Sequence, residues 1–177
     1  MEPDTILPEI EYPLDPKGPF VRPGTYTVTL RDGDAEATES FEVRGDREIA
    51  LTDEEWAERE TFLVDLLGHQ RSVFEAAQRA DEVHETLKAR LDERGGQAEE
   101  LRALVDSAEA RADDLGTLRY RIYSLASTFN WSGVTQPSLH PPTETHYRRF
   151  EALEDDLESK RAALESLVEK ARPYLSN

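Results

Sequence analysis

The chain has 177 residues, of which 38 are acidic and 21 are basic, so its formal net charge is −17. A surface of this charge repels phosphate groups, which argues against binding to nucleic acid or to anionic membranes. The chain has no cysteine, so it can form neither a disulfide nor a thiolate metal site. No apolar run approaches the roughly 18 residues that a membrane span needs, and the acidic N-terminus does not resemble a signal peptide.

The basic residues are mostly arginine, since lysine occurs only at Lys17, Lys88, Lys160 and Lys170. An acid-rich, lysine-poor surface suits a protein adapted to high salt, where screening relieves self-repulsion. A GC-rich genome, which favours arginine codons, accounts for the same composition. Both explanations remain open.

Residues 1–24 contain six prolines, which exclude a helix in this leader. After the leader, Tyr26, Val28 and Leu30 alternate with threonines, which predicts a half-buried strand. Asp32-Gly33 predicts a tight turn, and the alternation of Phe41 and Val43 with polar residues predicts a second strand. We therefore expect a proline-rich leader and a β-hairpin in residues 1–48.

A hairpin alone is marginal in water. An immunoglobulin-like sandwich takes about seven strands, more than residues 1–45 can hold. We expect the hairpin to be the remnant of such a sandwich, whose earlier strands lie upstream in a longer parent protein. The alternative is a small sheet that is completed by residues 6–14 and covered by the helices.

The hydrophobic period changes to that of a helix after Arg47. Thr52 and Glu55 can form a capping box, and helices are predicted at about 53–94, 97–129 and 143–172. Thr143 is the expected cap of the last helix, and Pro173 is expected to mark its end. Each helix has one apolar stripe at seven-residue spacing, which predicts an antiparallel three-helix bundle or coiled coil over residues 49–177. The fold class is thus mainly α with a small β part.

The stripes also predict the core. Gln70 and His84 lie on the first stripe and are interpreted as polar residues that set the register. Leu118→Ala is expected to cost about 2–5 kcal/mol if that leucine is core. The residues expected to be largely buried are Trp56, Leu66, Val73, Leu104, Leu118, Ile122, Phe150, Leu157 and Leu164.

The search for reactive residues yields no catalytic, cofactor-binding or metal-binding candidate. His69, His84, His140 and His146 form no His-Glu-x-x-His motif, and His140 and His146 flank a Pro-Pro corner without further ligands that the sequence identifies. The acid pairs 113–114 and 155–156 are interpreted as charged faces, because adjacent acids on a helix form no cleft. No nucleophile elbow, phosphate loop or dinucleotide fingerprint is found.

Three segments of the chain carry a family resemblance: "PFVRPGTYTVTL", "FEVRGDREIALTDEEW" and "PSLHPPTETHYRRFEALEDDL". They resemble the carboxyl-terminal region of large exported bacterial proteins with sortilin-like or BNR-repeat β-propellers, commonly labelled glycosyl hydrolases. Pro23-Gly24-Thr25-Tyr26 and Pro141-Pro142-Thr143 match that pattern in order, and the similarity covers about residues 18–160. A departure is Gly45-Asp46-Arg47, where the family usually has a proline-containing turn. The family's Asp-box repeats and catalytic acids are absent from this sequence, so no active-site residue is carried over.

The resemblance implies a non-catalytic C-terminal structural or interaction module of a protein that is secreted or in the cell envelope. Its partner would be the protein's own upstream propeller or another chain, with oligomerisation open. The alternative is a free-standing coiled-coil interaction protein whose hairpin is its own cap. An enzyme is the weakest of the three readings, and no cofactor is expected.

Overall fold

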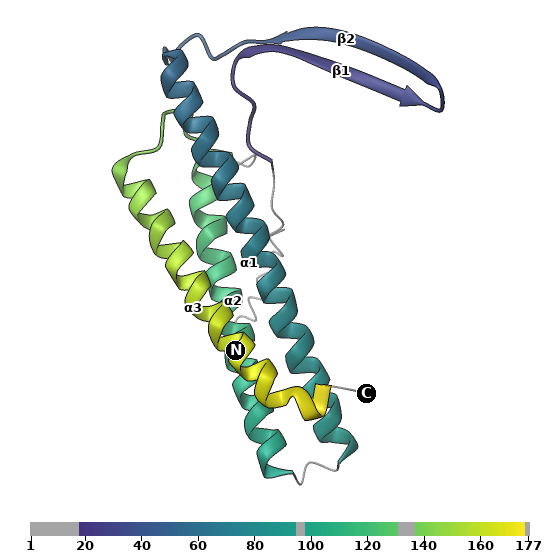
Figure 1. Cartoon of the computed structure of the whole chain (residues 1–177). Helices are drawn as coiled ribbons and strands as arrows, with labels where there is room; N and C mark the ends of the chain where they lie inside the picture. Colours follow the sequence, from purple (N-terminus) through teal and green to yellow (C-terminus); the bar gives the residue numbers. More distant parts are fainter. Residues whose placement is uncertain (1–17, 95–97, 131–136, 176–177) are drawn as a thin grey trace, which may run out of the picture.

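The computed structural model describes residues 18–94, 98–130 and 137–175. It is mainly α with a small β part: a two-stranded antiparallel hairpin precedes three long helices. Strand β1 spans Gly24–Asp32 and strand β2 spans Ala35–Val43. Helices α1, α2 and α3 span Asp53–Glu93, Glu99–Asn130 and Glu144–Leu175. In Figure 1 the helices run up and down alongside one another, and the hairpin projects from the end where α1 begins.

The apolar stripes of the three helices meet in one elongated core. Phe62, Leu66, Leu118 and Phe150 belong to a large cluster in the half of the bundle near the hairpin. A smaller cluster around Leu87 fills the other half. Burial along one stripe per helix is what stabilises helices of this length, since intrinsic helix propensity contributes little by itself.

Helix α1 begins with the predicted capping box. The amide of Glu55 donates to Thr52 Oγ1 at 3.2 Å, and the amide of Thr52 donates to a Glu55 carboxylate oxygen at 2.7 Å. The hydrogen bonds that the Glu55 carboxylate accepts from the backbone amide of Thr52 and then from its hydroxyl lower the pKa of Glu55. The sequence predicts that this helix ends at about residue 94, before a glycine pair at 95–96 that lies outside the described residues.

The prediction that Pro173 ends the last helix is wrong, because α3 continues to Leu175. A proline so near the end of a helix removes only one hydrogen bond of the last turn. Tyr174 and Leu175 pack against the smaller core cluster, and this contact favours continuing the helix. The ribbon of α3 changes direction in its last stretch, as expected beside a proline (Figure 1).

Seven of the nine predicted core residues are buried. They are Leu66, Val73, Leu118, Ile122, Phe150, Leu157 and Leu164. Trp56 is only partly buried, because it lies at the start of α1 beside Pro23 and Gly45, at the base of the hairpin. Leu104 is also only partly buried, because its neighbours Leu101 and Val105 take the inward-facing positions of α2.

The hairpin has a regular register from Gly24 opposite Val43 to Asp32 opposite Ala35. Its turn has two residues, and Gly33 adopts a φ of +57°, the left-handed backbone that a primed hairpin turn requires at this position. The tight turn predicted at Asp32-Gly33 is therefore confirmed.

Candidate interaction surfaces

The two faces of the hairpin differ in chemistry. One face is polar and bonded across the strands: Thr27 Oγ1 lies 3.1 Å from Ser40 Oγ, and Thr29 Oγ1 lies 3.3 Å from Thr38 Oγ1. These four hydroxyl groups therefore hydrogen-bond in two pairs across the strands.

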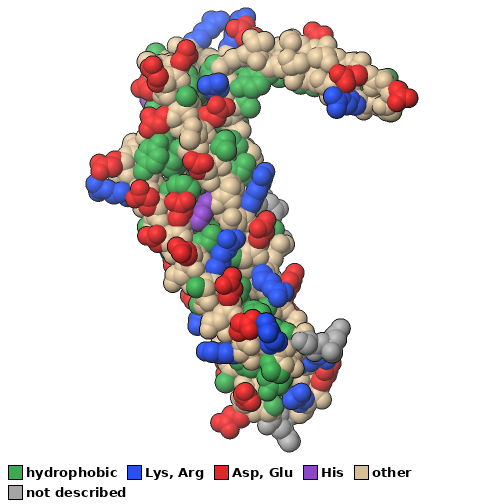
Figure 2. Space-filling view, in the orientation of Figure 1, with side chains coloured by type: hydrophobic (Ala, Val, Ile, Leu, Met, Phe, Trp, Pro, Cys, Tyr) green, Lys and Arg blue, Asp and Glu red, His purple; other side chains and the backbone are tan. Residues whose placement is uncertain are grey.

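The opposite face, which we call the apolar face, has two acids, Glu39 near its middle and Asp32 beside the turn. Its other side chains are those of Tyr26, Val28, Leu30, Ala35, Ala37, Phe41 and Val43. Val28 is 56% exposed, Leu30 70% and Phe41 47%. Figure 2 shows the hairpin as an arm that projects from the end of the bundle. Contiguous exposed apolar residues of this kind mark interaction sites more often than scattered ones do.

The expectation that the first strand is half-buried is wrong, because nearly every residue of β1 is exposed in the part of the chain that the structure describes. Alternation in the sequence reports that one face is apolar, and burial depends on what packs against it. The alternative in which helices cover the sheet is also wrong, since Leu30 and Val28 remain largely exposed beside the described helices. The proposed third strand, residues 6–14, lies outside the described residues.

The base of the hairpin is attached to the bundle. Arg22 Nε lies 3.4 Å from a carboxylate oxygen of Glu60 on α1, and the hydroxyl of Tyr26 donates to the Arg22 carbonyl at 2.8 Å. A Cβ added at Gly45 would lie 3.1 Å from Pro23 and 3.7 Å from Trp56, so the chain approaches closely there. These contacts set where the arm leaves the bundle.

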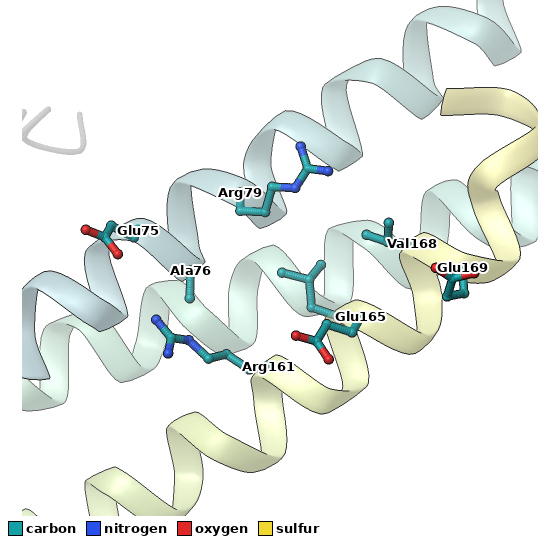
Figure 3. Close-up of a pocket in the computed structure, with 8 residues that line it drawn as sticks. Glu75, Ala76, Arg79, Arg161, Glu165, Val168 and Glu169 are labelled. Atoms are coloured by element: carbon teal, nitrogen blue, oxygen red, sulfur yellow. The ribbon is translucent and has the colours of Figure 1, made fainter. Parts of the chain in front are cut away.

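A second surface is a shallow groove between α1 and α3 (Figure 3). Arg161 crosses from α3 and donates to the Ser72 carbonyl of α1 at 2.9 Å. A hollow toward His69 shares Arg161 and Glu165 with this groove, so the two are continuous. The residues that line the groove between α1 and α3 are Glu75, Ala76, Arg79, Arg161, Leu164, Glu165, Val168 and Glu169.

A buried arginine joins the ends of the helices near the hairpin. Arg59 of α1 is 2% exposed and donates from Nη2 to the carbonyls of Phe129, at 3.2 Å, and Ser138, at 3.1 Å. Burial lowers the pKa of its guanidinium. Because the last carbonyls of a helix carry partial negative charge, the cation caps the end of α2.

Sequence reasoning overlooked Arg59, although a signal was present. Arg59 lies seven residues before Leu66, in the row of positions that faces the core. An arginine in that row indicates either a solvated end of the helix or a buried hydrogen-bonding role, and the structure shows the second.

His146 completes the cap of α3. Its Nδ1 accepts a hydrogen bond from the amide of Thr143 at 3.0 Å, and its ring lies edge-on to Phe129 with centroids 4.9 Å apart. Thr143 begins the helix, as predicted, with its carbonyl accepting from the amides of residues 146 and 147. His146 thus takes the place that glutamate or glutamine has in a capping box.

We expect acid to weaken the fold through two histidines. Burial lowers the pKa of His146, with a further contribution from Arg149, and burial also lowers the pKa of His69, which lies 3.2 Å from the Leu153 carbonyl. The folded chain then binds fewer protons than the unfolded chain, whose histidines have a pKa of about 6.5. This stabilisation is complete above that pH and is lost as the pH falls through the folded pKa values.

The measurement is the melting temperature of the helical circular dichroism signal between pH 7.5 and pH 5.5. Glutamine at position 146 keeps an acceptor for the Thr143 amide without titrating, so His146→Gln should show a smaller decrease than the wild type. A wild-type melting temperature that stays constant over this range would contradict the assignment.

The remaining candidates from the sequence are dispersed. His140 and His146 lie on either side of the Pro-Pro corner, as expected, while His69 and His84 lie farther along α1. Asp114 and Asp156 both approach Lys160, at 3.8 Å and 3.4 Å, in an ion-pair network between α2 and α3. In the described ranges, no group of three or more histidine or acidic side chains is placed to hold a metal ion. None of the described helices has the length and apolar content that a membrane crossing requires.

Comparisons with known proteins identify no relative. No family model, curated protein or solved structure matches the chain.

Proposed function

We propose that the chain is a non-catalytic structural and interaction module of a larger protein with a sortilin-like or BNR-repeat propeller. In this proposal the hairpin supplies two strands to a sandwich that precedes it, and the bundle braces the assembly. The observation that carries the proposal is the exposed apolar face, where Val28 and Leu30 are 56% and 70% exposed. Two strands alone seldom make a stable sheet, so a hairpin with an open apolar face is suited to joining another sheet.

The role as a brace is supported by the contacts at the hairpin's base. The ion pair of Arg22 with Glu60 and the close approach of Gly45 to Trp56 tie the hairpin to α1. A sheet that is added to the hairpin would then be held at a set place relative to the bundle. The resemblance of residues 18–160 to propeller proteins supplies the identity of that sheet in this proposal.

The test is the genomic sequence immediately upstream of the Met1 codon. An in-frame coding sequence for a β-propeller and the first strands of a sandwich is the expected result. A stop codon followed by a ribosome-binding site would overturn the proposal. Turnover of glycoside substrates by this chain alone would also overturn it, because the module is proposed to be non-catalytic.

The groove between α1 and α3 favours a second candidate, a free-standing protein that binds a partner helix. Ala76, Leu164 and Val168 are the apolar residues that line the groove. Figure 3 shows Ala76 and Val168 among charged side chains. A helix that docks there would convert three helices into four, which is a common bundle arrangement. The same upstream sequence separates this candidate from the first.

A further inference from the structure

The two strands of the hairpin differ in charge. The formal charge of β1 is zero, from Arg31 and Asp32, whereas β2 carries Glu36, Glu39 and Glu42. Arg31 forms an ion pair with Glu36 across the strands at 2.9 Å, and β2 remains the more acidic strand. Proteins protect exposed sheet edges with charged side chains, prolines or bulges. Within β1 there is neither a lysine nor a proline, and its pairing with β2 has no bulge. By charge, β2 is therefore the protected edge and β1 the open one.

We propose that a further strand of the sandwich pairs along β1, and that β2 forms the outer edge of the completed sheet. This inference rests on the proposed function, because the strand that joins β1 belongs to the sandwich of the larger protein.

The position of Glu39 supports this order of strands independently. Glu39 lies on the apolar face, opposite Val28 and two residues from Phe41. If β2 were a central strand, a second sheet packed on this face would bury the carboxylate, which is costly without a partner. If β2 is the outer strand, the Glu39 side chain can reach solvent at the edge of the sheet. A charge that points inward on an edge strand also discourages pairing with a further strand. On the apolar face, β1 has Tyr26, Val28 and Leu30 along its length, and its one acid there, Asp32, lies at the end beside the turn, so β1 suits a central position.

The register identifies a matched pair of positions for a test. Asp32 and Ala35 flank a two-residue turn, so they form the first hydrogen-bonded pair of the ladder. Because hydrogen-bonded and non-bonded pairs alternate, Thr29 and Thr38 are a non-bonded pair whose amides point outward. Their hydroxyl groups lie 3.3 Å apart, as expected for the closer type of pair. A proline at either position removes an outward amide and leaves the ladder of the hairpin intact.

The probe for the open edge is a second copy of the chain, which stands in for the missing strand. Antiparallel pairing of two β1 strands about Val28 places Arg31 opposite Thr25, so like charges do not meet. Equivalent pairing of two β2 strands about Glu39 places that acid opposite its own copy and Glu36 opposite Glu42. Self-association in the isolated chain is thus expected to use β1.

The experiment is sedimentation velocity over a range of protein concentrations in 1 M NaCl, which screens the net charge of −17. The wild type and Thr38→Pro should form a dimer with similar Kd, and Thr29→Pro should dimerise at least tenfold more weakly. Circular dichroism of each variant checks that the bundle remains folded.

Three results would overturn the inference: a wild type that stays monomeric, a dimer that neither proline affects, or loss of the dimer only in Thr38→Pro. The proposed function is tested separately by the upstream coding sequence. An in-frame sandwich together with an effect of Thr38→Pro would retain the function and reject β1 as the pairing edge.

Discussion

Replacing Phe129 by alanine is expected to lower the free energy of unfolding by about 3–5 kcal/mol. The Phe129 ring is fully buried, and it lies 5.5 Å from the ring of Phe62 on α1 and 4.9 Å from that of His146 on α3. The guanidinium of Arg59 lies 5.9 Å from the ring centroid. One side chain thus joins all three helices where the hairpin leaves the bundle, and its removal leaves a cavity that rigid helices fill poorly.

Urea denaturation followed by circular dichroism at 222 nm measures this loss. Tyr120→Ala is the matched control, because Tyr120 is an aromatic residue of the same helix but is 62% exposed. Its change should stay within about 0.5 kcal/mol. A loss below about 1 kcal/mol for Phe129→Ala would contradict the close packing of the three helices at this end.

The three helices could be predicted because their stability and their sequence pattern have the same cause. Leu101, Ala108, Leu115, Ile122 and Phe129 repeat every seven residues, and all five are buried in α2. The capping box of Thr52 and Glu55 is equally local, since both of its hydrogen bonds join residues three apart. Signals that depend on neighbours along the chain can be read from one sequence.

The features that could not be predicted correctly are contacts between segments that lie far apart in the sequence. Trp56 continues the row of core positions, but at its level the neighbour is the base of the hairpin, so it is only partly buried. Arg59 occupies a core position because carbonyls 70 and 79 residues away accept its hydrogen bonds. Nothing in the local pattern of α1 identifies those acceptors.

The candidate interaction surface was half predicted. Alternation along β1 and β2 correctly predicted that one face of the hairpin is apolar, because side chains of a strand point alternately to its two sides. Its exposure was not predicted, since the presence of a covering layer is a tertiary property. The groove between α1 and α3 was not predicted either, because it depends on how closely two helices approach.

The last prediction compares the same substitution at two leucines. Leu118 of α2 is fully buried in the larger core cluster, whereas Leu30 of β1 is 70% exposed. Leu118→Ala should cost about 2–5 kcal/mol through lost burial and the cavity that remains. Leu30→Ala should change the unfolding free energy by less than about 0.5 kcal/mol, because almost no packing is lost.

Both variants are measured by the helical signal in urea, which reports on the bundle. A substantial cost for Leu30→Ala would mean that the apolar face is already covered in solution, and that the hairpin is part of the same cooperative unit as the helices. A negligible cost for Leu118→Ala would mean that the register of the bundle is wrong. The expected difference between the two leucines follows from one physical point: Leu118 is buried by the bundle itself, while the apolar face that carries Leu30 is exposed.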